Sequence, residues 1–96
     1  MIDISNGMKR LEAQVYGDVH GVSFRAFAAR EARSRAITGT VSNTAEGSVL
    51  VIAEGETHEL ESFLLQLKAG PRFGRVDRVE TCWTEVTGTF SDFRVL

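Results

Sequence analysis

The sequence predicts an α+β domain of the split βαβ, ferredoxin-like type, in which an antiparallel sheet carries two helices on one face. Two observations indicate this fold. Segments in which apolar and polar residues alternate, as in strands, are interleaved with two segments whose apolar residues recur at helical spacings of three and four. Their order along the chain is β-α-β-β-α-β, followed by a short terminal strand.

The first strand and the first helix are separated by a glycine-containing loop. The strand is expected over residues 9–17, where apolar and polar side chains alternate. Residues 17–21 include two glycines and predict a loop. A helix is expected over residues 24–36, because apolar residues recur at offsets of three, four and eight from Phe24. Ser23 directly precedes this helix and is the expected N-cap.

The middle of the chain predicts a hairpin and a second helix. Two β-rich runs, residues 38–43 and 48–54, are separated by a four-residue turn that ends in glycine. The second run is apolar on both faces, as in a central strand. The second helix is expected to begin at Thr57 and to end at Gly70-Pro71, a common stop signal.

The two ends of the chain complete the expected domain. A long strand is expected over residues 76–86, and a short final strand over residues 93–95. Residues 1–8 have no clear period and are expected to form a flexible N-terminal tail. Residues 9–96 then form a single domain, since 96 residues leave no room for a second core.

Composition excludes several classes of function. A net charge of -2 and a pI of about 5.6 leave no basic field for binding nucleic acid. The apolar runs are too short to cross a membrane, and the first residues lack the basic start of a signal peptide. One cysteine and two histidines provide little for a disulfide framework or a metal site. We therefore expect a cytoplasmic protein without a metal, and we expect it to be a monomer.

The glycine-containing loop before the first helix has the chemistry of an anion site. Backbone N–H groups at such a junction can converge on one point, where the helix dipole also favours negative charge. Arg25 falls in the first turn of the helix, and a guanidinium can hold a phosphate through two parallel hydrogen bonds. On local physics alone, however, a glycine-rich loop before a helix is more often only a tight turn.

Two motifs resemble the signatures of the acylphosphatase family. The first signature is Gly-x-Val-Gln-Gly-Val-x-Phe-Arg, and the residues that match it are Gly17, Val19, Gly21, Val22, Phe24 and Arg25. The second is Gly-aromatic-Val-basic-Asn with later glycines, and residues 39–43 with Gly47 and Gly55 are similar to it. Three positions depart from these patterns: His20 replaces glutamine, Thr40 replaces an aromatic residue and Ser42 replaces a basic one. The resemblance covers residues 9–96.

The resemblance implies an enzyme that hydrolyses the carboxyl–phosphate bond of acyl phosphates to a carboxylate and inorganic phosphate, without a cofactor. It implies a phosphate-binding loop made of Val19, His20, Gly21, Val22, Ser23, Phe24 and Arg25. It also implies that Arg25 and Asn43 are catalytic, Asn43 by orienting the attacking water, with Gly17 and Thr44 as supporting positions. The chemistry is compatible, because a carboxylate whose acid has a pKa of roughly 4 leaves without being protonated.

Some alternatives stay open at this point. Domains similar to acylphosphatases also occur within larger carbamoyl-transfer maturation proteins, so the chain could be a non-catalytic module that binds phosphate or carbamoyl phosphate. Because the chain carries none of the additional domains of those proteins, we expect the stand-alone enzyme. For single residues, Arg25 could be a surface arginine and Asn43 an ordinary turn residue.

Overall fold

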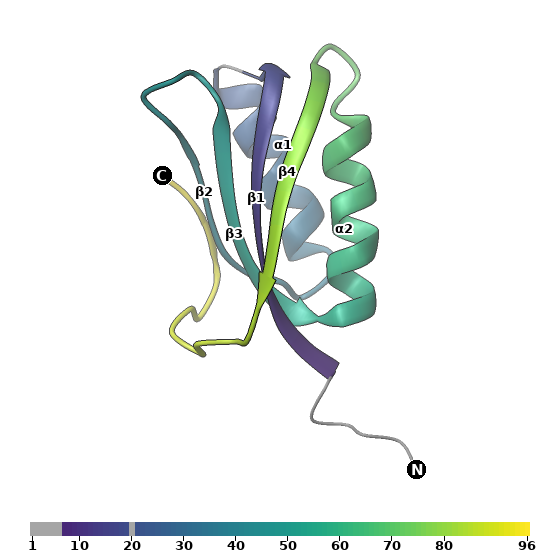
Figure 1. The fold of residues 1–96 in the computed structure, drawn as a ribbon, viewed down its shortest axis with the longest axis vertical. Helices are drawn as coiled ribbons and strands as arrows, with labels where there is room; N and C mark the ends of the chain where they lie inside the picture. The colour runs from purple at the N-terminus through teal and green to yellow at the C-terminus, as the bar shows by residue number, and fades with distance from the viewer. Residues whose placement is uncertain (1–6, 20) are drawn as a thin grey trace.

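The protein forms two layers, a five-stranded sheet with two helices packed on one of its faces (Figure 1). The computed structural model describes residues 7–19 and 21–96, apart from the side chain of Val22. The elements in chain order are β1 (Met8–Asp18), α1 (Val22–Arg33), β2 (Thr38–Asn43), β3 (Val49–Glu56), α2 (Thr57–Ala69), β4 (Arg75–Thr84) and β5 (Phe93–Val95). This order confirms the one predicted from the sequence. In the described residues no helix is long and apolar enough to cross a membrane.

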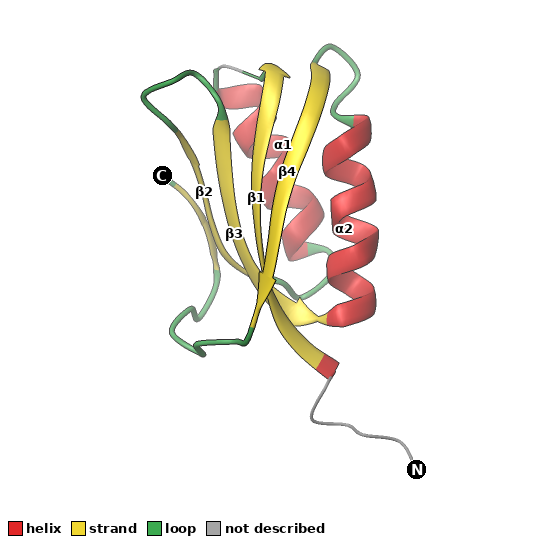
Figure 2. Ribbon diagram, in the orientation of Figure 1, coloured by secondary structure: helices red, strands yellow, loops and turns green. Residues whose placement is uncertain are grey.

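The sheet is mixed rather than wholly antiparallel. Its strand order is β4-β1-β3-β2-β5, and the four long strands pair antiparallel, as predicted. The short β5 adds a parallel pair at the edge, where Phe93 lies opposite Gly39 of β2. Figure 2 shows both helices on the same side of this sheet, so no helix of the described residues covers its other side.

Several element boundaries differ from the prediction. β1 begins at Met8, the last residue assigned to the tail, and residues 1–6 of that tail lie outside the described residues. α1 begins at Val22 and its N-cap is Gly21, so the prediction that Ser23 caps the helix was wrong. Gly21 occupies that position because its backbone adopts a φ of 84°, which favours glycine.

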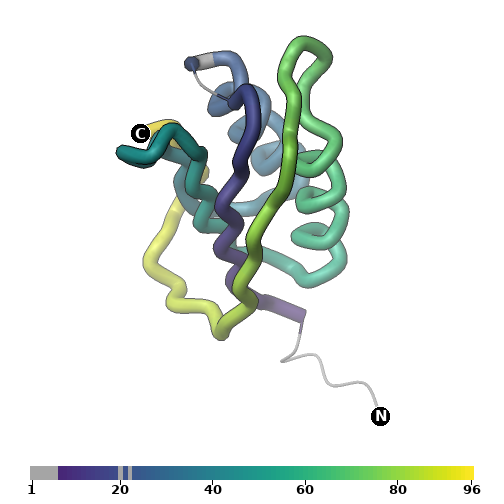
Figure 3. The backbone as a smooth tube through the Cα atoms, turned by 45° about the horizontal axis from the view of Figure 1, so that its top comes forward, coloured from purple at the N-terminus to yellow at the C-terminus, as the bar shows by residue number. Residues whose placement is uncertain are grey.

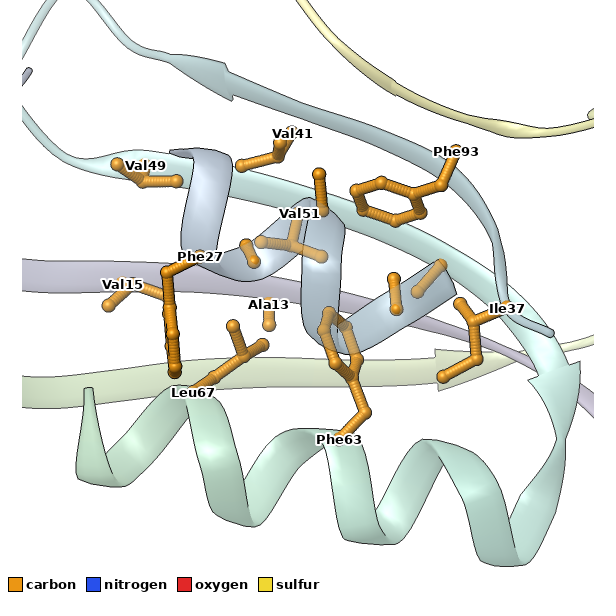
Figure 4. Packing of buried hydrophobic residues seen from close by; sticks show 14 of the residues in the cluster. Ala13, Val15, Phe27, Ile37, Val41, Val49, Val51, Phe63, Leu67 and Phe93 are labelled. Atoms are coloured by element: carbon orange, nitrogen blue, oxygen red, sulfur yellow. The ribbon is translucent and has the colours of Figure 1, made fainter. Parts of the chain in front are cut away.

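The core lies between the sheet and the helices (Figure 4). Alternate residues of β1 point into it, and α2 contributes Leu60, Phe63 and Leu67 from one helical face. The rings of Phe63 and Phe93 meet edge to face, with their centroids 6.2 Å apart. Each such fully buried side chain stabilises the fold by about 1.5–3 kcal/mol. The contact between Phe63 and Phe93 also ties β5 to α2.

A buried carboxylate on the uncovered face holds the connection between β4 and β5. Glu54 accepts hydrogen bonds from the backbone amides of Thr87 (2.9 Å) and Gly88 (3.0 Å), from the Thr87 hydroxyl (2.8 Å) and from Arg10 (3.3 Å). Burial acts to raise the pKa of Glu54, but these hydrogen bonds outweigh it and hold the pKa below its ordinary value. The connection can therefore carry the chain from the β4 edge to the opposite edge, where β5 pairs with β2.

Candidate functional site

The N-terminus of α1 is left open. Among the described residues no side chain caps it, and its first turn contains no acidic residue. α2 is different, because the Glu56 side chain accepts a hydrogen bond from His58 N (3.0 Å) and Glu59 lies in the first turn. The N-terminus of α2 is thus already occupied by carboxylates of the chain itself, one of which accepts a hydrogen bond from a backbone N–H group. The first N–H groups of α1 remain available to an external anion.

The strand that leads into α1 is shaped by Gly17. The pairing of β1 with β4 shifts register between Tyr16 and Gly17, which marks a β-bulge. Gly17 has a φ of 140°, and a Cβ atom there would collide with the backbone oxygen of Arg75. The structure therefore gives Gly17 a role in directing the chain out of the sheet toward α1.

The predicted phosphate-binding loop is anchored at both ends by buried side chains. Val19 is fully buried and Phe24 is 2% exposed, so both belong to the core. Gly21 and Ser23, which lie between them, are exposed. His20 and the side chain of Val22 lie outside the described part of the chain. The anchoring thus leaves the backbone at Gly21 and Ser23 on the surface, at the open end of α1.

Arg25 points from the first turn of α1 toward the far edge of the sheet. Its Nη1 donates to the backbone oxygen of Leu96 (2.8 Å), and Leu96 N donates to the backbone oxygen of Val41 in β2 (2.9 Å). Its Nε is buried and has no hydrogen-bond partner among the described residues. A buried donor without an acceptor costs about 1–3 kcal/mol. This Nε therefore indicates a position where an acceptor is expected to bind.

Asn43 lies at the same end of the sheet as Arg25. It is the last residue of β2, two positions after Val41, and it pairs with Val49 of β3. The residue is exposed, and within the described chain its side-chain amide makes no hydrogen bond. Figure 3 shows the β2–β3 hairpin, the C-terminus and the start of α1 at one end of the molecule. The fold thus places the two residues that the sequence singled out at the same end of the sheet.

Thr44 closes the hairpin that follows Asn43. Its hydroxyl lies 2.7 Å from Ser48 Oγ and accepts from Ser48 N (3.2 Å), while Thr44 N donates to Ser48 O (2.9 Å). Ser48 is buried, and its Oγ also accepts from Gln14 Nε2 of β1 (2.8 Å). The sequence reasoning missed Gln14 and Ser48. Gln14 could have been suspected, because it is a polar residue on the uncovered face of a central strand.

Comparison with known proteins identifies the family. A family model described as Acylphosphatase matches residues 11–95. This chain belongs to the acylphosphatase family. An acylphosphatase of Salinibacter ruber is 44% identical over 87 residues, which cover 91% of this chain and 92% of that protein. An acylphosphatase of Thermus thermophilus is 47% identical over 81 residues, 84% of this chain and 92% of that protein.

Solved structures favour the catalytic acylphosphatase over the non-catalytic module. The crystal structure of acylphosphatase from Bacillus subtilis superposes with a TM-score of 0.87 at 31% identity, covering 92% of this chain and 98% of that one. HypF from T. kodakarensis also matches, with a TM-score of 0.78 at 28% identity. That match covers 92% of this chain but only 12% of HypF. This acylphosphatase therefore corresponds to whole small acylphosphatases and to one part of a larger protein.

Proposed function

We propose that this acylphosphatase hydrolyses acyl phosphates by attack of water on phosphorus, with Arg25 binding the phosphate and Asn43 orienting the water. One observation carries the proposal. Within the described residues, the buried Nε of Arg25 has no hydrogen-bond partner, no side chain caps the N-terminus of α1, and the amide of Asn43 makes no hydrogen bond. Arg25 lies in the first turn of α1, at the same end of the sheet as Asn43. These are a cation, a set of backbone donors and a polar amide, which are the groups that this reaction requires.

The phosphate is held by Arg25 together with the backbone of residues 19–25. Because Nη1 already donates to Leu96, the edge of the guanidinium that carries Nε and Nη2 is the one that can form a fork with two phosphate oxygens. The loop residues Val19, His20, Gly21, Val22, Ser23, Phe24 and Arg25 supply backbone N–H groups. The positive end of the α1 dipole adds to the attraction.

The reaction is a single displacement at phosphorus with one proton transfer. The water oxygen forms a bond to phosphorus while the bond from phosphorus to the acyl oxygen breaks, and the carboxylate leaves with the electron pair. The Asn43 amide oxygen accepts a hydrogen bond from the water and orients it. Asparagine cannot take up a proton near neutral pH, so a phosphate oxygen accepts the proton that the water loses. The leaving carboxylate requires neither an acid nor a metal ion.

The proposal also assigns two supporting residues, the active unit, the oligomeric state and the compartment. Gly17 supports the loop from its bulge, and Thr44 supports Asn43 through the hairpin turn. The active unit is residues 9–96, acting as a monomer in the cytoplasm, where the single cysteine stays reduced. Size-exclusion chromatography with light scattering on the purified protein tests the expectation of a monomer. A molar mass equal to two copies of the chain would contradict it.

Hydrolysis of benzoyl phosphate tests the function. In EDTA the purified protein is expected to release benzoate and phosphate well above the uncatalysed rate. In ¹⁸O-labelled water the label is expected in phosphate and not in benzoate, because water attacks phosphorus. Absence of turnover by correctly folded protein would overturn the proposal, and label in benzoate would overturn the attack on phosphorus.

A further inference from the structure

A hollow of ≈ 380 Å³ lies beside the start of α1, between this helix and the connection from α2 to β4. Ser23, Phe27 and Arg30 line it from α1, and Arg72 and Phe73 line it from the connection. Successive residues of a helix are about 100° apart, so Arg25 projects from the opposite side of α1. The hollow therefore begins at the open N-terminus of α1 but lies away from Arg25 and Leu96.

The hollow combines aromatic surface with positive charge that no carboxylate of the described residues pairs with. The Arg30 guanidinium lies 5.9 Å from the centre of the Phe27 ring, and that of Arg72 lies 5.6 Å from the Phe73 ring, which is 91% exposed. Neither arginine has an ion-pair partner in the described part of the chain. Six other basic residues each pair with a carboxylate: Lys9, Arg10, Arg35, Arg75, Arg78 and Arg94. Among the residues that the structure describes, none that lines the hollow carries a carboxylate.

The position of the hollow matches the direction in which the leaving group departs. In phosphoryl transfer the attacking and leaving oxygens lie on opposite sides of phosphorus. β1 leads into α1, and the strand order puts β2, with Asn43, on one side of β1 and β4 on the other. The connection that carries Arg72 leads directly into β4 (Figure 3). A phosphate at the start of α1 thus lies between Asn43 and the hollow.

We infer that this hollow binds the acyl portion of the substrate, and that Arg30 and Arg72 select acyl phosphates whose acyl portion carries a second negative charge. The inference rests on the proposed function, because the water at Asn43 defines the opposite side. Two guanidinium groups on facing walls match a carboxylate or phosphate at the far end of the acyl group. The rings of Phe27 and Phe73 provide an apolar surface between that group and the reacting phosphate.

Two substrates that differ by a single carboxylate test the inference. The ratio of kcat/KM for 4-carboxybenzoyl phosphate to that for benzoyl phosphate is measured for the wild type, Arg30→Gln, Arg72→Gln and the double variant. Each substitution is expected to lower the ratio by up to about fivefold, the effect of losing one exposed ion pair, and the double variant is expected to lower it further. The kcat/KM for benzoyl phosphate itself is expected to change by less than about twofold, because neither arginine faces Asn43 or Arg25.

The control variant Lys9→Gln also removes one positive charge, but at the start of β1, the end of that strand farther from α1. It is expected to leave the ratio unchanged, which separates a local effect from the change in net charge. An equal ratio in all four test proteins would overturn the inference while hydrolysis of benzoyl phosphate still upheld the function. A fall in the Lys9→Gln ratio that matched those of the arginine variants would also overturn it. No turnover of either substrate would overturn both.

Discussion

At the scale of residues, the proposed site rests on polar groups of Arg25 and Asn43 that have no hydrogen-bond partner within the described residues. Arg25 and Asn43 could be named from sequence, because both lie in motifs that resemble family signatures. The contact of Arg25 with Leu96 could not, since it joins groups 71 positions apart whose proximity depends on the folded sheet. That the Nε of Arg25 is buried without a partner in the described part of the chain could not be predicted either, because the burial of one atom depends on neighbours from several elements.

Replacing Arg25 by lysine tests whether the shape of the guanidinium matters beyond its charge. Lysine keeps the charge but cannot form a planar fork with two phosphate oxygens while also reaching Leu96. We expect kcat/KM for benzoyl phosphate to fall by about 10²-fold, a typical effect of losing an oriented donor. Arg94→Lys, on β5, is the matched control and should retain activity. Activity of Arg25→Lys within a few-fold of wild type would contradict the role given to the fork.

Glu54 gives a pH-dependent contribution to stability. Its folded pKa is held below the unfolded one, so its contribution is present above the unfolded value of about 4.3 and is lost as pH falls through the folded pKa. Glu54→Gln is expected to lower the free energy of unfolding by about 1–3 kcal/mol at pH 7. Urea titrations should show that this difference shrinks below about pH 4. A difference that stayed constant with pH would contradict the assignment.

At the scale of elements, the boundaries of helices and strands could be predicted best where they depend on residues that are neighbours in the sequence. β2 and the start and end of α2 agree with the prediction, because alternation, a first-turn Glu59 and the Gly70-Pro71 stop are all local. The start of α1 was misplaced, because the cap is set by the backbone of Gly21 rather than by the Ser23 hydroxyl. The parallel pairing of β5 was missed, since it depends on a long connection that Glu54 holds.

The β2–β3 hairpin offers a test of how an element positions Asn43, the residue proposed to orient the water. Ser48→Ala removes the hydroxyl that joins Thr44 to Gln14. We expect a loss of about 1–2 kcal/mol in unfolding free energy and a fall in kcat that exceeds any change in KM, because Asn43 is then less well oriented. Ser42→Ala, earlier in β2, serves as control. An unchanged kcat in Ser48→Ala would show that the network does not position Asn43.

At the scale of the whole molecule, the site exists only when distant segments meet. The start of α1, the end of β2 and the residue after β5 contribute to it, and the crossing connection brings the last of these into place. The reaction could be anticipated from the resemblance of two motifs. The proposed division of the site into a water side at Asn43 and an acyl side at Arg30 and Arg72 could not be anticipated, because it is argued from strand order and from the pairing of surface charges.

The division of work between Arg25 and Asn43 is the central claim, and paired measurements of kcat and of inhibition by inorganic phosphate test it most directly. Asn43→Ala is expected to lower kcat for benzoyl phosphate by about 10²-fold or more while the inhibition constant for phosphate stays near that of the wild type. Arg25→Ala is expected to lose both turnover and inhibition by phosphate. Full activity in Asn43→Ala, or unchanged phosphate inhibition in Arg25→Ala, would contradict the account.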